Sequence, residues 1–185
     1  MIEIRVPDPS VVLLVGPAGA GKSTFAARHF RPDEIVSSDA FRAAVAGNPG
    51  DQRATPVAFR ILHRELERRL RDRRLVVVDA TNVERHARMA ILRRAAAARV
   101  AAVAIVFDLP IDIVHARNDA RRGSARVPAA AVDMQAAALR RSLRAGRLGA
   151  EGLALVVRLR STDAVDEVRI RRLPPTLGVA APDAR

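Results

Sequence analysis

Nine consecutive residues, GPAGAGKST from Gly16 to Thr24, follow the pattern GxxxxGK with Ser or Thr next. Glycines at this spacing let the backbone curl so that several N–H groups converge on one anion, as in loops that hold nucleotide phosphates. Lys22 would reach the β- and γ-phosphates, and the hydroxyl of Ser23 would ligate Mg²⁺. The pattern therefore predicts that the chain binds ATP with Mg²⁺ for phosphoryl transfer. The residues expected to hold the nucleotide from this loop are Gly16, Ala18, Gly19, Ala20, Gly21, Lys22, Ser23 and Thr24.

Lys22 is the one lysine in a chain with 32 Lys and Arg residues and a formal net charge of +12. Arginine, with its planar fork, is a poor substitute where a compact ammonium must fit inside a narrow loop, so the position is one where the shape of lysine matters. The abundance of arginine has two interpretations. It could reflect a GC-rich genome, whose codons favour Arg and Ala, or it could serve to bind a polyanionic partner. An aromatic content of 3% argues against a surface on which bases stack.

Further polar side chains follow two short apolar runs, where a phosphoryl acceptor and a metal would be held. Asp79 closes the run LVVVD and would orient Mg²⁺ or its water, with capping of the next turn as the alternative. Thr81 and Asn82 follow it. Asp39 and Arg42 lie three residues apart after the run EIVS, so one helical turn would place them on one face. Asp39 would accept the proton of an acceptor hydroxyl and Arg42 would hold an acceptor phosphate. The alternative is that Asp39 is only the N-cap of the next helix and Arg42 its neighbour on the surface.

Three arginines form a candidate lid. Arg117 and Arg121 are four residues apart on a predicted helix, and Arg126 follows the break at Gly123. Such a segment, at about 110–145, would close over ATP and stabilise charge on the transferring phosphoryl group. The alternative is that the three arginines lie on a solvated helix face and do not contact ATP. The four histidines have no metal-ligand spacing, and the absence of cysteine excludes disulfides and thiolate metal sites.

Strands and helices alternate along the chain, which predicts an α/β fold with a parallel sheet covered on both faces. One domain is expected over residues 1–173, with a disordered tail at 174–185, in a cytoplasmic protein without a membrane span. The expected strands are 11–15, 34–37, 75–79, 100–107 and 153–159. The expected helices are 22–29, 40–46, a long one capped by Thr55 with Pro56 at its first position, 84–98, 110–122, 128–144 and a last turn at 165–171.

The segments GPAGAGKSTFA, VSSDAFR, VVVDATNVERHAR and FDLPIDIVHARNDARRGSARVP together resemble the kinase module of bacterial polynucleotide kinase–phosphatase, over about residues 11–170. The resemblance implies a P-loop kinase fold with the five strands in the order 2-3-1-4-5. It also implies transfer of the γ-phosphate of ATP to a 5′-hydroxyl end of RNA or DNA, with Asp39 as general base. The implied catalytic residues are Lys22, Asp39, Arg42, Arg117 and Arg121.

The same resemblance assigns the remaining binding residues. It places Arg117 and Arg121 on the ATP phosphates with Arg126 in support, and Arg42 on the phosphate next to the terminal nucleoside. The residues that would line the acceptor site with Asp39 and Arg42 are Thr81, Asn82, Arg85 and Arg88, with Arg85 and Arg88 as alternative matches to the arginine of the family. Related kinases of small alcohols share the loop, the base and the lid, so a sugar, antibiotic or nucleoside kinase is the alternative, and a nucleotide-hydrolysing switch is a further one.

Overall fold

The structure is a computed structural model that describes residues 1–48 and 51–174. Its centre is a five-stranded parallel sheet with the strand order β3-β4-β2-β5-β6. This is the order that the sequence analysis expected. The strands are β2 (Ser10–Val15), β3 (Ile35–Ser37), β4 (Val76–Asp79), β5 (Ala101–Phe107) and β6 (Leu155–Leu159).

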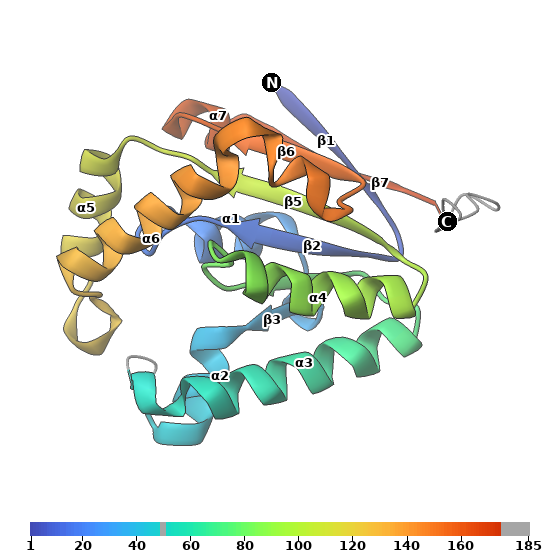
Figure 1. Cartoon of the computed structure of the whole chain (residues 1–185), viewed down its shortest axis with the longest axis horizontal. Helices are drawn as coiled ribbons and strands as arrows, with labels where there is room; N and C mark the ends of the chain where they lie inside the picture. The colour runs from blue at the N-terminus through green and yellow to red at the C-terminus, as the bar shows by residue number, and fades with distance from the viewer. Residues whose placement is uncertain (49–50, 175–185) are drawn as a thin grey trace.

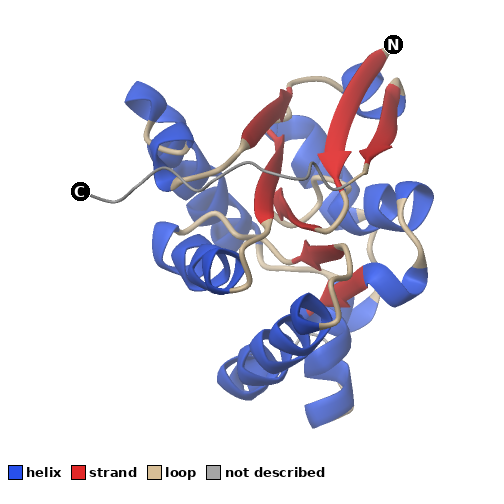
Figure 2. Ribbon diagram, turned by 90° about the vertical axis from the view of Figure 1, so that its right-hand side faces the viewer, coloured by secondary structure: helices blue, strands red, loops and turns tan. Residues whose placement is uncertain are grey.

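Helices cover both faces of this sheet (Figures 1 and 2). All six residues of β2 are buried, as expected for a central strand of a parallel sheet. Its side chains alternate between two cores. Leu13 packs with α3, α4 and α6 on one face, and Leu14 packs with α1 and with Ile4, Val6 and Val168 on the other. The helices are α1 (Lys22–His29), α2 (Ser38–Ala46), α3 (Thr55–Arg71), α4 (Arg85–Ala97), α5 (Ile111–Asp119), α6 (Ala129–Leu143) and α7 (Thr162–Asp166).

Short 3₁₀ turns connect several of these elements. They comprise Pro32–Glu34, Gln52–Ala54, Gly123–Ala125, Arg144–Gly146 and Gly149–Glu151. None of the helices in the described part of the chain is long and apolar enough to cross a membrane. The tail expected at 174–185 lies outside the described residues, except for Pro174.

A second sheet joins the two ends of the chain, and the sequence analysis missed it. β1 (Ile2–Pro7) pairs in parallel with β7 (Val168–Leu173) beside the main sheet (Figure 2). The predicted last turn of helix at 165–171 is therefore wrong, because α7 ends at Asp166 and a strand follows. Ile4 and Val168 enter the core that contains Leu14. The buried Glu34 carboxylate accepts two hydrogen bonds of 2.7 Å from Arg172 and so fastens β7 to the domain.

Candidate active site

The candidate residues meet at one edge of the main sheet. The carboxyl ends of neighbouring parallel strands point the same way, so the segments that leave them share an edge, where such sheets bind ligands. β2 leads into the glycine-rich loop and α1, β3 leads into α2, β4 leads toward α4, and β5 leads into α5 (Figure 1). Gly16 donates its N–H to Thr81 O at 2.9 Å and ties the loop to the segment after β4.

The glycine-rich loop has the curled backbone that its sequence requires. Gly19 and Gly21 have φ angles of 88° and 90°, in the left-handed region that favours glycine. Gly19 also has no room for a side chain, since a Cβ on this residue would lie 2.3 Å from Val114 O of α5. Gly21 caps α1 without a side-chain hydrogen bond, which leaves the first N–H groups of the helix directed at the loop.

Lys22 and Asp79 form the buried charged centre of the site. The Lys22 side chain lies inside the loop and its Nζ donates to Pro17 O at 2.8 Å. Burial lowers the pKa of Lys22 to about 8, although the Asp79 carboxylate opposes this effect. Burial likewise raises the pKa of Asp79, against a hydrogen bond from Ser23 and the charge of Lys22. Asp39 and Arg121 also act on both groups, so the four charged side chains belong to one cluster.

Ser23 and Asp79 fit a magnesium ion that arrives with a nucleotide. A hydroxyl and a carboxylate are oxygen ligands, and Mg²⁺ usually takes one or two carboxylates plus substrate phosphates. No group of three or more His, Cys, Asp or Glu side chains within residues 1–48 and 51–174 would hold a metal by itself. The donor set therefore suits a metal shared with a triphosphate, and not a metal held by the protein alone.

The lowered pKa of Lys22 predicts that ATP affinity depends on pH. Above pH 8 the Lys22 amine of the free protein is largely deprotonated. A bound triphosphate favours the charged ammonium, so Lys22 takes up a proton when the complex forms. Affinity for MgATP should be nearly constant from pH 6.5 to 7.5 and should fall above pH 8 by up to about tenfold per pH unit. Titration calorimetry at pH 8.5 in buffers of different ionisation enthalpy would measure the proton uptake. Equal affinities at pH 7 and pH 9 would contradict this effect.

Asp39 is exposed to solvent, whereas the side chain of Arg42 beside it is only 13% exposed. Ser37 is the N-cap of α2, with its hydroxyl accepting from Ala40 N, so the alternative in which Asp39 is the N-cap is wrong. Asp39 lies in the first turn of the helix, with its side chain 57% exposed, and forms an ion pair with Arg42. Ser38 donates from its hydroxyl to Asp39 Oδ1 at 3.2 Å. The carboxylate is thus oriented by two neighbours and still accessible to an incoming hydroxyl group.

The four residues expected to complete the acceptor site separate into two groups. Arg85 has a side chain that is 71% exposed, and Thr81 is half-buried, so both are available to a ligand. Asn82 is 2% exposed and its Nδ2 donates to Leu14 O at 2.9 Å, so this amide fastens the end of β2. Arg88 is fully buried. The structure therefore contradicts the expectation that Arg88 lines the acceptor site.

Arg88 instead holds the fold together beneath that site. Its guanidinium group donates to both oxygens of Glu151, at 2.8 and 2.7 Å, and to the carbonyl oxygens of Asn82 and Val83. This bidentate pair connects α4 with the turn before β6 and leaves no donor directed at a ligand. Among α4 residues whose motif position suggested acceptor contact, Arg85 remains the candidate.

The role of Arg88 gives a stability prediction. Arg88→Met would leave the buried Glu151 carboxylate without its partner and should reduce the free energy of unfolding by about 3–5 kcal/mol. Arg85→Met is the matched control, because Arg85 is exposed and its Nε lies 3.9 Å from the same carboxylate. Urea unfolding of both variants would measure the difference. Equal losses in the two variants would contradict the structural role.

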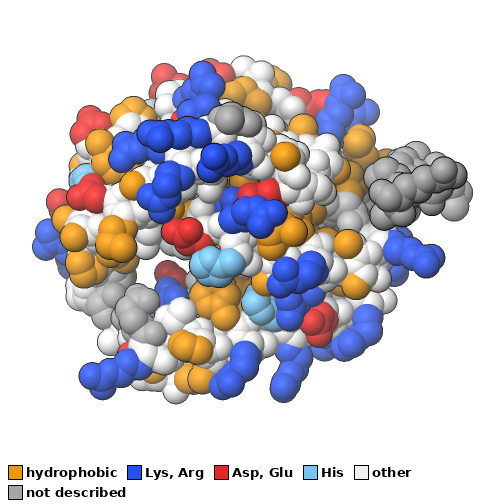
Figure 3. Space-filling model, in the orientation of Figure 1, with side chains coloured by type: hydrophobic (Ala, Val, Ile, Leu, Met, Phe, Trp, Pro, Cys, Tyr) orange, Lys and Arg blue, Asp and Glu red, His pale blue; other side chains and the backbone are white. Residues whose placement is uncertain are grey.

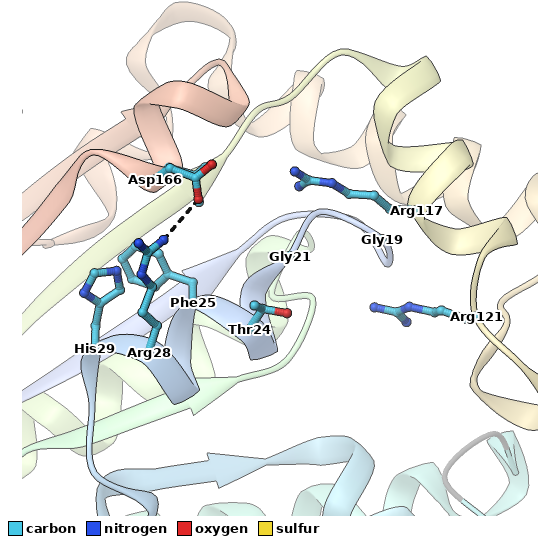
Figure 4. Close-up of a pocket in the computed structure, with 10 residues that line it drawn as sticks. Gly19, Gly21, Thr24, Phe25, Arg28, His29, Arg117, Arg121 and Asp166 are labelled. Carbon is cyan, nitrogen blue, oxygen red and sulfur yellow. Dashed lines mark hydrogen bonds and ion pairs between the residues drawn. The ribbon is translucent and has the colours of Figure 1, made fainter.

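Two of the three lid arginines lie at the loop. Arg117 and Arg121 line a cleft of about 380 Å³ together with Gly19 and Gly21 (Figure 4). A Cβ on Gly21 would lie 3.3 Å from Arg117 Nη1, so the Arg117 guanidinium group covers the loop. Arg126 differs, because it donates twice to Asp119 at 3.1 and 2.8 Å and is held within the lid.

The same cleft contains residues that the sequence analysis did not select. Figure 4 shows that α1 and α7 supply its other wall, with Arg28 paired to Asp166 at 3.1 Å. The further lining residues that were not selected are Phe25, His29 and Val165. The α1 residues could have been found, since they follow the loop at helical spacing. The α7 residues are more than 130 positions away in the chain, and no local signal marks them.

An open hollow lies beside the loop. Figure 3 shows it between α2, the start of α4 and the lid helices, on a face where many arginine side chains gather. Arg144 and Arg147 are exposed near the end of α6, and Arg85 is exposed at the start of α4. Exposed positive charge is therefore present at the start of α4 and near the end of α6, where it could attract a polyanionic ligand.

Comparisons with known proteins agree with this geometry. The family model AAA_33, described as an AAA domain, matches residues 11–144. None of the curated proteins that were compared matches the chain significantly. A chain from a structure titled as the Pnkp1/Rnl/Hen1 RNA repair complex superposes with a TM-score of 0.62 at 23% identity, over 74% of this chain and 46% of that chain. This chain thus spans less than half the length of that relative.

Two further structures cover most of both chains. A putative kinase from Chloroflexus aurantiacus has a TM-score of 0.59 at 14% identity, over 83% of this chain and 85% of that chain. A gluconokinase from Sinorhizobium meliloti has a TM-score of 0.51 at 19% identity, over 88% of each chain. At these identities the likeness shows a common fold.

Proposed function

The chain belongs to the AAA_33 family and has the fold of P-loop kinases, and from this premise we propose that it transfers the γ-phosphate of ATP to the 5′-hydroxyl end of a polynucleotide. The fold and the site together support a phosphotransferase of the kinase type, whichever hydroxyl group it acts on. One observation carries the proposal. The exposed Asp39 carboxylate belongs to the same charged cluster as Lys22 and Asp79.

The residues of the loop would bind and orient the triphosphate. Backbone N–H groups after Gly19 hold its oxygens, Lys22 counters the β- and γ-phosphate charge, and Arg117 covers the loop from the lid side. Ser23 and Asp79 would hold Mg²⁺, which when bound neutralises charge on the phosphate oxygens. These contacts fix the γ-phosphorus for attack along the line of the bond that breaks.

Asp39 would act on the acceptor. It accepts the proton of the attacking hydroxyl as the bond between that oxygen and the γ-phosphorus forms and the bond to the bridging β,γ-oxygen breaks, so ADP leaves. The guanidinium group of Arg42 pairs with the carboxylate and directs it. Arg42 would also lie within reach of a phosphate near the acceptor hydroxyl.

A polynucleotide suits the acceptor side better than a small alcohol does. The Asp39 side chain is 57% exposed, and many arginine side chains gather on the face of the molecule that Figure 3 shows. An open basic surface attracts a chain of phosphates. One solved structure with this fold is titled as part of an RNA repair complex, which agrees with such an acceptor.

A small-molecule alcohol is the second candidate acceptor. Structures titled as a sugar kinase, a gluconokinase and a shikimate kinase share the fold. Such an acceptor would make few phosphate contacts, so its binding would depend little on ionic strength. Salt dependence therefore separates the two candidates.

The experiment compares a 5′-hydroxyl oligonucleotide with sugars, gluconate and shikimate at equal hydroxyl concentration, with MgATP in excess. We expect the oligonucleotide to be phosphorylated, with a kcat/KM that falls by about tenfold or more from 50 to 200 mM salt through counterion release. A 5′-phosphorylated oligonucleotide is the control and should accept nothing. Phosphorylation of a small alcohol alone, with no salt effect, would reject the polynucleotide assignment.

A further inference from the structure

A side chain of the lid segment holds the backbone of the phosphate loop. Gln135 of α6 accepts a hydrogen bond at Oε1 from Ala18 N at 2.8 Å, across 117 residues of sequence. Ala18 is 7% exposed. The N–H of Ala18 was expected to contact the nucleotide phosphates, whereas in the structure it donates a hydrogen bond to the Gln135 side chain.

The bond acts on one peptide plane. Ala18 N–H and Pro17 C=O belong to the same peptide group and, in the trans form, point in opposite directions. While Gln135 holds the N–H, the carbonyl oxygen on the other side accepts from Lys22 Nζ at 2.8 Å and from Ala20 N at 3.2 Å. The orientation of this peptide therefore connects Gln135 to the ammonium group of Lys22.

The helices that carry this contact form a rigid support. Gly19 packs so closely on α5 that a Cβ there would lie 3.2 Å from Asn118 Cβ. The fully buried Asn118 side chain donates to Val127 O at 2.7 Å and accepts from Val127 N at 3.1 Å. These two bonds join the end of α5 to the chain just before α6.

We propose that Gln135 is a positioning residue for the nucleotide, which fixes the Pro17–Ala18 peptide so that its carbonyl oxygen places the Lys22 ammonium group. The inference rests on the proposed nucleotide site. Gln135 acts through Lys22 and does not contact the phosphates itself. Without it, the peptide can rotate, and Lys22 loses the acceptor that holds it in the loop.

The test is Gln135→Met, which keeps the length of the side chain and removes the strong acceptor. We expect the KM for ATP to rise about 5–10-fold, as for one lost hydrogen bond, with the KM for the acceptor unchanged. A purely structural defect would instead lower kcat through a smaller active fraction and leave both KM values in place. The matched control is Met134→Ala on the same helix, where the side chain points to solvent, and it should behave as wild type.

A second measurement does not require turnover. In Gln135→Met the Ala18 amide should exchange with solvent about fivefold faster or more, while amides within α3 keep their protection. A KM for ATP within twofold of wild type, or unchanged exchange at Ala18, would overturn the inference. If the wild-type chain bound no ATP, the proposed function would fail, and the exchange data would still decide whether Gln135 fixes this peptide.

Discussion

Replacement of Asp39 by asparagine is expected to reduce phosphoryl transfer by about 10²–10⁴-fold and to leave the affinity for MgATP nearly unchanged. An amide of the same shape keeps the position next to Arg42 but cannot take the proton of the acceptor hydroxyl. The loop that holds the nucleotide is not altered, since Asp39 lies on α2, outside residues 16–24. Single-turnover transfer and equilibrium binding of MgATP would measure the two effects separately.

The control for this variant is Asp72→Asn. Asp72 is exposed at the end of α3 and pairs with an arginine, Arg68, at 3.3 Å, so it shares the chemistry of Asp39 outside the site. It should retain full transfer. If Asp39→Asn kept more than a tenth of the wild-type rate, Asp39 would not be the general base and the acceptor would be activated in another way.

The second large effect is expected at the lysine of the loop. Lys22→Met should lower kcat/KM for ATP by about 10²–10³-fold or more, because the β- and γ-phosphates lose the ammonium that counters their charge. Lys22→Arg is the informative companion. It keeps the charge, but the planar guanidinium group does not fit the space in which Nζ meets Pro17 O.

Both Lys22 variants should fold, as circular dichroism would show, so loss of activity would not reflect loss of structure. We expect Lys22→Arg to recover less than a tenth of the wild-type kcat/KM. Wild-type activity in Lys22→Arg would contradict the argument that the shape of lysine, and not only its charge, is required in the loop.

The local parts of the site could be predicted from the sequence. The glycine pattern of residues 16–24 indicates a curled backbone, and the apolar runs that precede it and Asp79 indicate the buried parallel strands that the structure contains. The strand order also agrees with the resemblance to known kinases. The loop and the strands depend on neighbouring residues, so a short stretch of sequence is sufficient to identify them, whereas the strand order came from the resemblance over most of the chain.

Features that depend on distant partners could not be predicted. Arg88 looks like any exposed arginine until Glu151, 63 residues later, is placed against it. The strands β1 and β7 each alternate apolar and charged residues, but their pairing joins the two ends of the chain. The Gln135 contact is equally remote from the loop that it holds. Each of these depends on tertiary packing that no local pattern encodes.

The central claim is that the chain moves the γ-phosphate of ATP to a hydroxyl group and not to water. The most direct measurement follows the label from γ-³²P-ATP with a 5′-hydroxyl oligonucleotide, for the wild-type chain and Asp39→Asn. The account predicts label on the 5′ end of the oligonucleotide with the wild-type chain and almost none with the variant. Label found only in inorganic phosphate, at equal rates for both proteins, would contradict it.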